Sequence, residues 1–155
     1  MALILFDTNI FIDMLNGVHQ ATVELSTYDR PAISTITYME LRAGQAVRPH
    51  EALILDAVLD EFAVLPLDPQ VTELAIEIRG ASLVTGPRVK LPDAIIAATA
   101  AAYNIPVVTR NPRDFAWTGI QVHVPYDYDF ATGQVMNVRP PFSNFKPRPT
   151  LTRLR

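Results

Sequence analysis

ALILFDTN, at residues 2–9, is the most informative stretch of the chain. Its unbroken apolar run is typical of a strand covered on both faces, as in a parallel sheet. The run leads directly into Asp7. In open α/β sheets, ligands collect at the carboxyl ends of the strands. The sequence therefore predicts that Asp7 lies where folds of this kind carry out chemistry.

Short apolar segments alternate with longer helical patterns along the rest of the chain. Further strands are predicted at 32–34, 63–65, 105–109 and 120–124, and helices at 10–15, 19–28, 35–45, 49–62, 69–83 and 93–103. In the 49–62 helix, Leu53, Ala57 and Val58 are expected to face inward. Strands separated by helices imply a parallel sheet with helices on both faces. The predicted fold class is α/β, a three-layer α/β/α sandwich with a mainly parallel central sheet.

The charge distribution divides the 155 residues into two parts. Residues 1–130 contain all 16 acidic residues and carry a net charge of −8, whereas residues 131–155 carry +5 and no acid. The second part is rich in proline and contains Phe142 and Phe145. We therefore predict a folded domain at 1–130 and a basic, Pro-rich tail at 131–155.

The composition limits the cellular context. There is no cysteine, so disulfides and thiolate metal sites are excluded, and a reducing cytoplasm fits. No apolar run approaches the roughly 20 residues of a membrane span. The first apolar run is too short for a signal peptide and lacks a basic lead-in. We expect a soluble, cytoplasmic protein without a membrane partner.

Several carboxylates are predicted to meet at one edge of the sheet. Asp7 ends the first strand, Glu40 lies about one helical turn after the second, and Asp93 lies in the first turn of a helix. Asn111 and Asp114 follow the fourth strand. Carboxylates that share a cleft repel one another, and a divalent cation removes that conflict. Mg²⁺ prefers such oxygen ligands, and the arrangement favours metal-assisted cleavage of a phosphodiester.

Each of these residues also has a purely structural interpretation. Asp7 is in the position of a helix N-cap, and Glu40 is placed to form a capping box with Thr37. Asp93 suits the positive end of a helix dipole, and residues 111–114 suit a turn. Only the predicted convergence on one edge distinguishes a site from four local roles.

An ordered set of motifs resembles the PIN-domain ribonucleases of the VapC toxin type. The matching segments are LFDTN at 5–9, IS at 33–34 with Glu40-Leu41 and Gly44, LPDAIIAA at 91–98, and VTRNPRDF at 108–115. The resemblance implies a PIN-like fold and a Mg²⁺-dependent endoribonuclease, with Mn²⁺ as the other metal considered. It also implies a small antitoxin partner that inhibits the active site, and a homodimer.

The resemblance assigns roles to individual residues. Asp7 and Asp93 match the main metal-binding aspartates, and Glu40 matches the acid that completes the catalytic site. Thr8 matches a hydroxyl beside the first aspartate. The fourth acidic position is left open between Asn111, which stands where many relatives have Asp, and Asp114. Other aspartates, such as Asp13, are interpreted as solvated charge.

The expected substrate is RNA, and the resemblance points to structured RNA such as tRNA. Thr8, Arg110 and Arg113 are the candidate substrate-binding residues, and the two arginines lie next to the site in the sequence. For either arginine taken alone, the preferred interpretation is an ordinary surface cation. The apolar residues Tyr38-Met39, Leu53-Ile54-Leu55 and Leu59 are candidates for a dimer or antitoxin surface, or for the core.

Two other functions fit parts of the pattern. A phosphatase of the haloacid dehalogenase type also begins with a strand-borne Asp, but it needs a second acid where Asn9 stands. The alternative function is a non-catalytic PIN-fold protein that binds RNA or protein. Asp7, Glu40 and Asp93 argue against it, and Asn111 argues for it.

Overall fold

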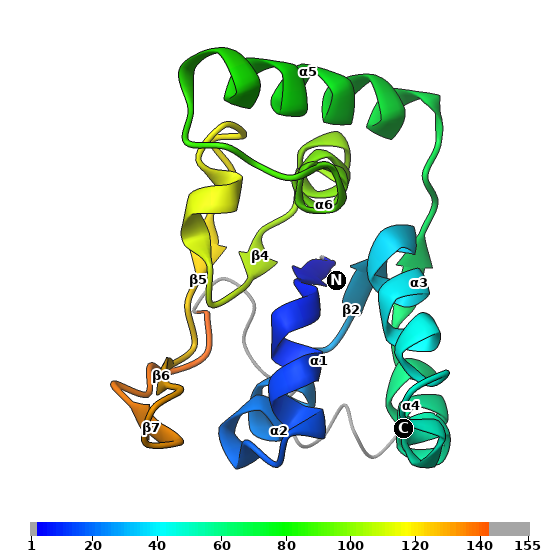
Figure 1. The fold of residues 1–155 in the computed structure, drawn as a ribbon, viewed down its shortest axis with the longest axis vertical. Helices are drawn as coiled ribbons and strands as arrows, with labels where there is room; N and C mark the ends of the chain where they lie inside the picture. The colour runs from blue at the N-terminus through cyan, green and yellow to red at the C-terminus, as the bar shows by residue number, and fades with distance from the viewer. Residues whose placement is uncertain (1–2, 143–155) are drawn as a thin grey trace.

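The computed structural model describes residues 3–142 (Figure 1). Predictions that concern Phe145 and the rest of 143–155 lie outside the described residues. In the described part, no helix is both long enough and apolar enough to cross a membrane.

Five parallel strands form the central sheet, in the order β3-β2-β1-β4-β5. The strands are β1 (Ile4–Phe6), β2 (Pro31–Ser34), β3 (Ala63–Leu65), β4 (Val107–Val108) and β5 (Val122–His123). In the register, Leu5 of β1 lies between Ala32 and Val107. All three residues of β1 are fully buried, as the apolar run predicts.

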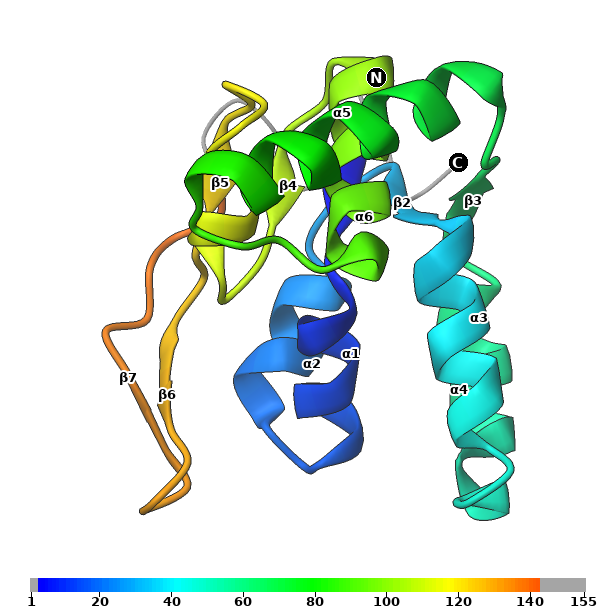
Figure 2. The same cartoon turned by 45° about the horizontal axis from the view of Figure 1, so that its top comes forward.

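Helices cover both faces of this sheet (Figures 1 and 2). The helices are α1 (Thr8–Leu15), α2 (His19–Leu25), α3 (Thr35–Gly44), α4 (Ala52–Leu59), α5 (Pro69–Thr85) and α6 (Leu91–Tyr103), with 3₁₀ turns η1 (Pro49–Glu51) and η2 (Pro112–Phe115). Ile4 and Phe6 point into a core shared with α1, α2 and α4, whereas Leu5 points into a core shared with α5 and α6. The predicted three-layer α/β/α sandwich is confirmed.

The inward face predicted for the 49–62 helix is wrong for Leu53 and Ala57, whereas Val58 is half-buried and packs against the core as predicted. Leu53 is 81% exposed and Ala57 is exposed, while Leu55 and Leu59 are buried. The segment ALILDAVL is apolar nearly all round, so its periodicity does not select one face. The 3₁₀ turn η1 precedes the helix, and the spacing of Leu55 and Leu59 then sets the buried stripe.

A two-stranded hairpin follows β5 and was not predicted. Strands β6 (Asp127–Asp129) and β7 (Gln134–Met136) pair antiparallel around a turn in which Gly133 adopts a φ of +71°. The predicted boundary after residue 130 falls inside this hairpin. Tyr128, Val135 and Phe142 pack against the core that contains β1. Residues 131–142 therefore continue the folded body.

Candidate active site

The candidate site lies at the carboxyl edge of the sheet, between β1 and β4. From β1, the sheet is extended on one side by β2 and β3 and on the other side by β4 and β5. The direction in which strands are added therefore reverses between β1 and β4. Open α/β sheets bind ligands at such switch points. The Asp7 backbone N–H donates to the Val108 carbonyl over 2.9 Å, which fixes the two strand ends side by side.

Asp7 is buried at the N-cap of α1 and is 5% exposed. Its carboxylate accepts hydrogen bonds of 2.7 Å from the Thr8 backbone N–H and from the Thr109 hydroxyl. The capping role is thus confirmed, and it fixes the carboxylate at the edge. Burial raises the pKa of Asp7 from 3.8 to about 6; the charges of Asp93 and Asp114 add to the rise, and the two hydrogen bonds oppose it.

Thr109 holds this part of the site together. Its Oγ1 donates to Asp7 and accepts from the Asn9 side-chain amide over 3.2 Å and from the Asn111 backbone N–H over 2.9 Å. The side-chain Oδ1 of Asn9 accepts from the Arg110 backbone N–H. The sequence analysis did not assign these roles to Asn9 and Thr109. Their place at the carboxyl ends of two predicted parallel strands was the available signal.

Asp93 and Asp114 extend the acidic cluster. Asp93 lies in the first turn of α6, and Asp114 lies in η2. Burial raises the pKa of Asp114 to about 6 and the charge of Asp93 contributes, while Arg113 and Lys90 oppose the rise. Burial also raises the pKa of Asp93, and Lys90 opposes this. The charge of Asp93 thus raises the pKa of both Asp7 and Asp114, and that of Asp114 raises the pKa of Asp7.

Asn111 contacts Asp114 directly. The Asn111 side-chain amide donates to Asp114 Oδ2 over 2.9 Å. The sequence left the fourth position open between these two residues. In the structure the carboxylate of Asp114 is coupled to Asp93, and the amide of Asn111 orients that carboxylate.

Glu40 reaches the site from α3 and is exposed. Its carboxylate accepts a 2.8 Å hydrogen bond from the Thr8 hydroxyl, which also contacts the Thr37 hydroxyl at 2.9 Å. The cap of α3 is Ser34, whose Oγ accepts from the Thr37 backbone N–H. The contact of Glu40 with Thr8 links the helix after β2 to the residue after Asp7.

Arg110 is engaged in an ion pair beside the acidic cluster. Its guanidinium donates to both carboxylate oxygens of Asp13 over 2.5 and 2.9 Å, and the Tyr126 hydroxyl donates to the same carboxylate over 2.6 Å. The guanidinium also lies 5.0 Å from the centroid of the Phe130 ring. The interpretation of Asp13 as solvated charge is wrong, because Asp13 is 1% exposed and paired. Arg113, in contrast, is exposed.

The donor chemistry fits a hard divalent cation. Among residues 3–142, no three Asp, Glu or His side chains are close enough together to form a ready-made metal cluster. Mg²⁺ does not need one, because it keeps several waters and usually takes one or two protein carboxylates. Asp7, Asp93 and Asp114 supply oxygen donors whose mutual repulsion a cation relieves, and none of them forms an ion pair with a described residue.

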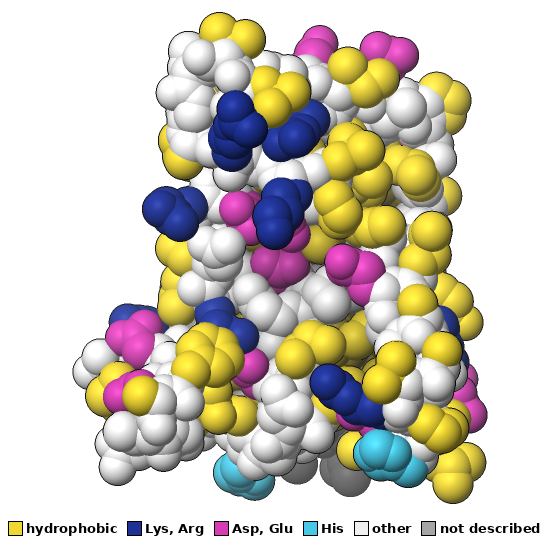
Figure 3. Space-filling model, in the orientation of Figure 1, with side chains coloured by type: hydrophobic (Ala, Val, Ile, Leu, Met, Phe, Trp, Pro, Cys, Tyr) yellow, Lys and Arg dark blue, Asp and Glu magenta, His cyan; other side chains and the backbone are white. Residues whose placement is uncertain are grey.

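The surface around the site combines both signs of charge. Acidic side chains gather at the centre of the face shown in Figure 3, between α6 above and α1 and α3 below, and Lys and Arg side chains lie above them. An acidic centre with basic residues around it is suited to a metal ion and a phosphodiester bound together.

Comparison with known proteins identifies the family. A family model described as "PIN domain" matches residues 4–119. This chain belongs to the PIN-domain family. Among its relatives, "Ribonuclease VapC5" of Mycobacterium tuberculosis is 32% identical over 116 residues, covering 71% of this chain and 83% of that protein. "Toxin FitB" of Neisseria gonorrhoeae is 30% identical, over 80% of this chain and 99% of that protein.

A solved relative supports the same assignment. A "Toxin-antitoxin complex from Klebsiella pneumoniae" is 36% identical with a TM-score of 0.66, over 79% of this chain and 98% of that one. The resemblance to VapC-type PIN toxins inferred from the sequence motifs is thereby confirmed. The PIN fold of this chain places Asp7 at the end of β1 and Asp93 at the start of α6.

Proposed function

We propose that this PIN-domain protein is a divalent-metal-dependent endoribonuclease and the toxin of a toxin–antitoxin pair. The observation that carries the proposal is the group of Asp7, Asp93 and Asp114 at the switch point of the sheet, where burial raises all three pKa values, Asp93 and Asp114 add to the rise at Asp7, and Asp93 adds to that at Asp114. Relatives named as a ribonuclease and as toxins support the same function.

In this proposal Asp7, Asp93 and Asp114 hold Mg²⁺ or Mn²⁺, and Glu40 completes the catalytic site. The cation supplies Lewis-acid polarisation of the phosphodiester and lowers the pKa of a water molecule. Thr8 holds the Glu40 carboxylate in a fixed orientation through the 2.8 Å hydrogen bond, which suits Glu40 to orient the attacking water. Asn111 orients Asp114, and it is a positioning residue rather than the fourth acid.

Arg113 is the basic residue that best fits a role in substrate binding. It is exposed next to Asp114, and its charge lowers the pKa of that carboxyl. Arg110 has its guanidinium on Asp13, so we assign it to the support of the loop that carries Asn111. Structured RNA such as tRNA is the proposed substrate class, and the cytoplasm is the proposed compartment.

The proposed antitoxin or dimer surface lies on α3 and α4. Tyr38 and Met39 of α3 and Leu53 and Ile54 of α4 are all exposed, with exposed fractions between 36% and 81%. Apolar side chains gathered on two neighbouring helices suit a protein partner. The complex from Klebsiella pneumoniae is described as one of toxin with antitoxin, which supports a partner of that kind here.

RNA cleavage mapping tests the proposal. Purified protein is incubated with a pool of cellular RNA and Mg²⁺, Mn²⁺ or EDTA, and the ends of the products are sequenced. We expect cleavage at few sites, with 5′-phosphate and 3′-hydroxyl ends, and none in EDTA. RNA that is bound but intact in every metal would overturn the nuclease assignment in favour of a non-catalytic binding protein.

A further inference from the structure

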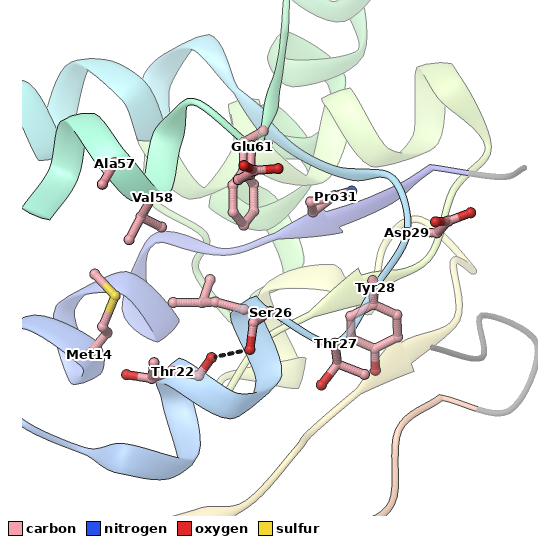
Figure 4. Close-up of a pocket in the computed structure, with 12 residues that line it drawn as sticks. Met14, Thr22, Ser26, Thr27, Tyr28, Asp29, Pro31, Ala57, Val58 and Glu61 are labelled. Carbon is pink, nitrogen blue, oxygen red and sulfur yellow. Dashed lines mark hydrogen bonds between the residues drawn. The ribbon is translucent and has the colours of Figure 1, made fainter. Parts of the chain in front are cut away.

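A cavity of about 420 Å³ opens at the opposite end of α1 from Asp7 (Figure 4). Met14 of α1, Leu25 of α2, and Val58 and Phe62 on or after α4 supply its apolar lining. Thr22 and Ser26 lie along one side and Glu61 along another. The lining residues include no Lys or Arg. The pocket therefore offers an apolar floor with an acidic side chain beside it.

The described chain ends at the wall of this pocket. Tyr28 lines the pocket, and its hydroxyl accepts a 3.0 Å hydrogen bond from the Phe142 backbone N–H. The ring of Phe142 lies 6.1 Å from that of His123. The Tyr28 hydroxyl in turn donates to Glu24 over 2.6 Å. Because Tyr28 and Glu24 are both buried, residue 142 is fixed beside the pocket.

The sequence beyond this point has complementary chemistry. Residues 143–155 read SNFKPRPTLTRLR, with four basic residues, no acidic residue and an aromatic ring at position 145. Three extended residues span about 10 Å, which brings Phe145 within reach of the pocket from Phe142. Glu61 is exposed and forms no ion pair with a described residue.

This end of the chain also lies beyond the part that the family shares. The family model stops at residue 119. FitB and the matched chain of the complex from Klebsiella pneumoniae are covered over 98–99% of their own lengths, yet they cover only 79–80% of this chain. If the C-terminal segment that those relatives lack binds to the folded domain, it must bind to a surface outside the shared active site.

We propose that the pocket beside Tyr28 is the docking site of the chain's own C-terminal segment, residues 143–155, with the Phe145 ring on the apolar floor and basic side chains beside Glu61. Burial of one aromatic ring supplies most of the affinity, and the charge contact adds less because it is solvent-exposed. The proposal does not depend on the nuclease function.

Chymotrypsin cleavage after Phe145 tests this docking in the full chain, followed by intact mass. A synthetic peptide of residues 138–155 gives the rate for an accessible site. Proteolysis tracks the open population, so we expect the parent protein to be cut at least about tenfold more slowly than the peptide. Ala57→Arg places a long cation at the pocket, and this variant should be cut at close to the peptide rate. Glu61→Gln should give a smaller increase.

Val84→Arg is the matched control, because Val84 of α5 is 83% exposed, is not part of the pocket lining and lies outside the proposed partner surface on α3 and α4. It should be cut at the parent rate, and thermal melts followed by circular dichroism verify that both arginine variants fold. Equal rates for parent, Ala57→Arg and peptide would overturn the proposal. So would a change in oligomeric mass of Ala57→Arg with an unchanged cleavage rate, which would instead assign the pocket to a second copy of the chain.

Discussion

Two buried aspartates on α1 have opposite environments. Asp13 near the end of the helix receives both nitrogens of one edge of the Arg110 guanidinium and the hydroxyl of Tyr126. Asp7 at the start receives one backbone N–H, one threonine hydroxyl and, over 3.4 Å, the side-chain amide of Asn9, and the charges that act on its pKa come from Asp93 and Asp114. The first carboxylate is neutralised by the protein. The Asp7 carboxylate, in contrast, has no cationic partner among the described residues, which leaves it able to bind a cation from solution.

The difference separates a carboxylate that stabilises the fold, Asp13, from one that is available to bind a ligand, Asp7. A buried ion pair that satisfies all its partners holds the fold, and removing one partner leaves the other buried without a counter-charge. A buried carboxylate surrounded by other carboxylates costs stability in the absence of a ligand, and such costs are typical of functional sites. Substitutions at the two positions should therefore change different properties of the protein.

The largest effect is expected from Asp93→Asn. The substitution removes one of the proposed cation ligands while keeping the side-chain shape, so we expect RNA cleavage to fall by roughly a hundred- to a thousand-fold. The measurement is single-turnover cleavage of a mapped RNA substrate in Mg²⁺. Asp56→Asn is the control, because Asp56 is exposed and pairs with Arg42. Cleavage by Asp93→Asn at the control rate would remove Asp93 from the site.

Asp13→Asn should lower stability rather than chemistry. It leaves the Arg110 guanidinium, which is 16% exposed, without its carboxylate. Loss of one partner from such a buried pair costs about 3 kcal/mol, measured as the free energy of unfolding in urea. Asp56→Asn breaks an exposed pair and should cost less than about 1 kcal/mol. If the free energies of unfolding of Asp13→Asn and Asp56→Asn differ by less than about 1 kcal/mol, the Asp13–Arg110 ion pair does not stabilise the fold.

Asp7→Asn should have the opposite sign and raise stability at neutral pH in the absence of metal. The folded pKa of Asp7, about 6, exceeds its ordinary 3.8, so between these values the folded state binds more protons than the unfolded state. Stability contributed by this group is thus present at low pH and lost as pH rises through about 6. Asn carries no charge, but its single side-chain oxygen can keep the hydrogen bond from the Thr8 N–H and not also the one that the second Asp7 oxygen accepts from Thr109. The gain at pH 7.5 therefore stays below the limit of about 3 kcal/mol that the pKa shift sets.

Urea unfolding of Asp7→Asn and the parent at pH 4 and pH 7.5 checks this pH dependence. The advantage of the variant should be largest at pH 7.5 and nearly absent at pH 4. Addition of Mg²⁺ should stabilise the parent and leave the variant unchanged. A variant whose stability relative to the parent is lower at pH 7.5 than at pH 4 would show that the charged form of Asp7 is favoured in the folded state, against the raised pKa.

Local sequence patterns predicted well the elements that carry Asp7 and Asp93. The apolar run before Asp7 predicted a buried parallel strand, and the place of Asp93 after Pro92 predicted a carboxylate in the first turn of α6. Both depend on neighbours in the sequence. The alternation of helices and strands then limited the sheet to a parallel arrangement with the strand ends on one edge.

The sequence did not predict partners that depend on long-range packing. Asp13 meets Arg110 and Tyr126 across 97 and 113 residues, and neither contact follows from periodicity. The hairpin that brings Phe130 over Arg110 was also missed, although Tyr126, Tyr128 and Phe130 alternate with acids before Gly133. Such alternation over a few residues was too short to distinguish a hairpin from a tail.

The smallest effect is expected from Arg113→Ala. Unlike Arg110, Arg113 is exposed and serves no buried carboxylate, so the fold should be unaffected. Loss of one phosphate contact should weaken RNA binding by about threefold, and the slope of log affinity against log salt concentration should become less negative by about one.

Arg113 also lowers the pKa of Asp114, so the acidic limb of the pH–rate profile should move to higher pH in the variant. Lys90→Ala, which removes the other cation that lowers this pKa, should move the limb in the same direction, whereas Arg42→Ala should leave it in place. An unchanged pH–rate profile in Arg113→Ala would show that the Arg113 charge does not act on Asp114, and would leave Lys90 as the cation that does.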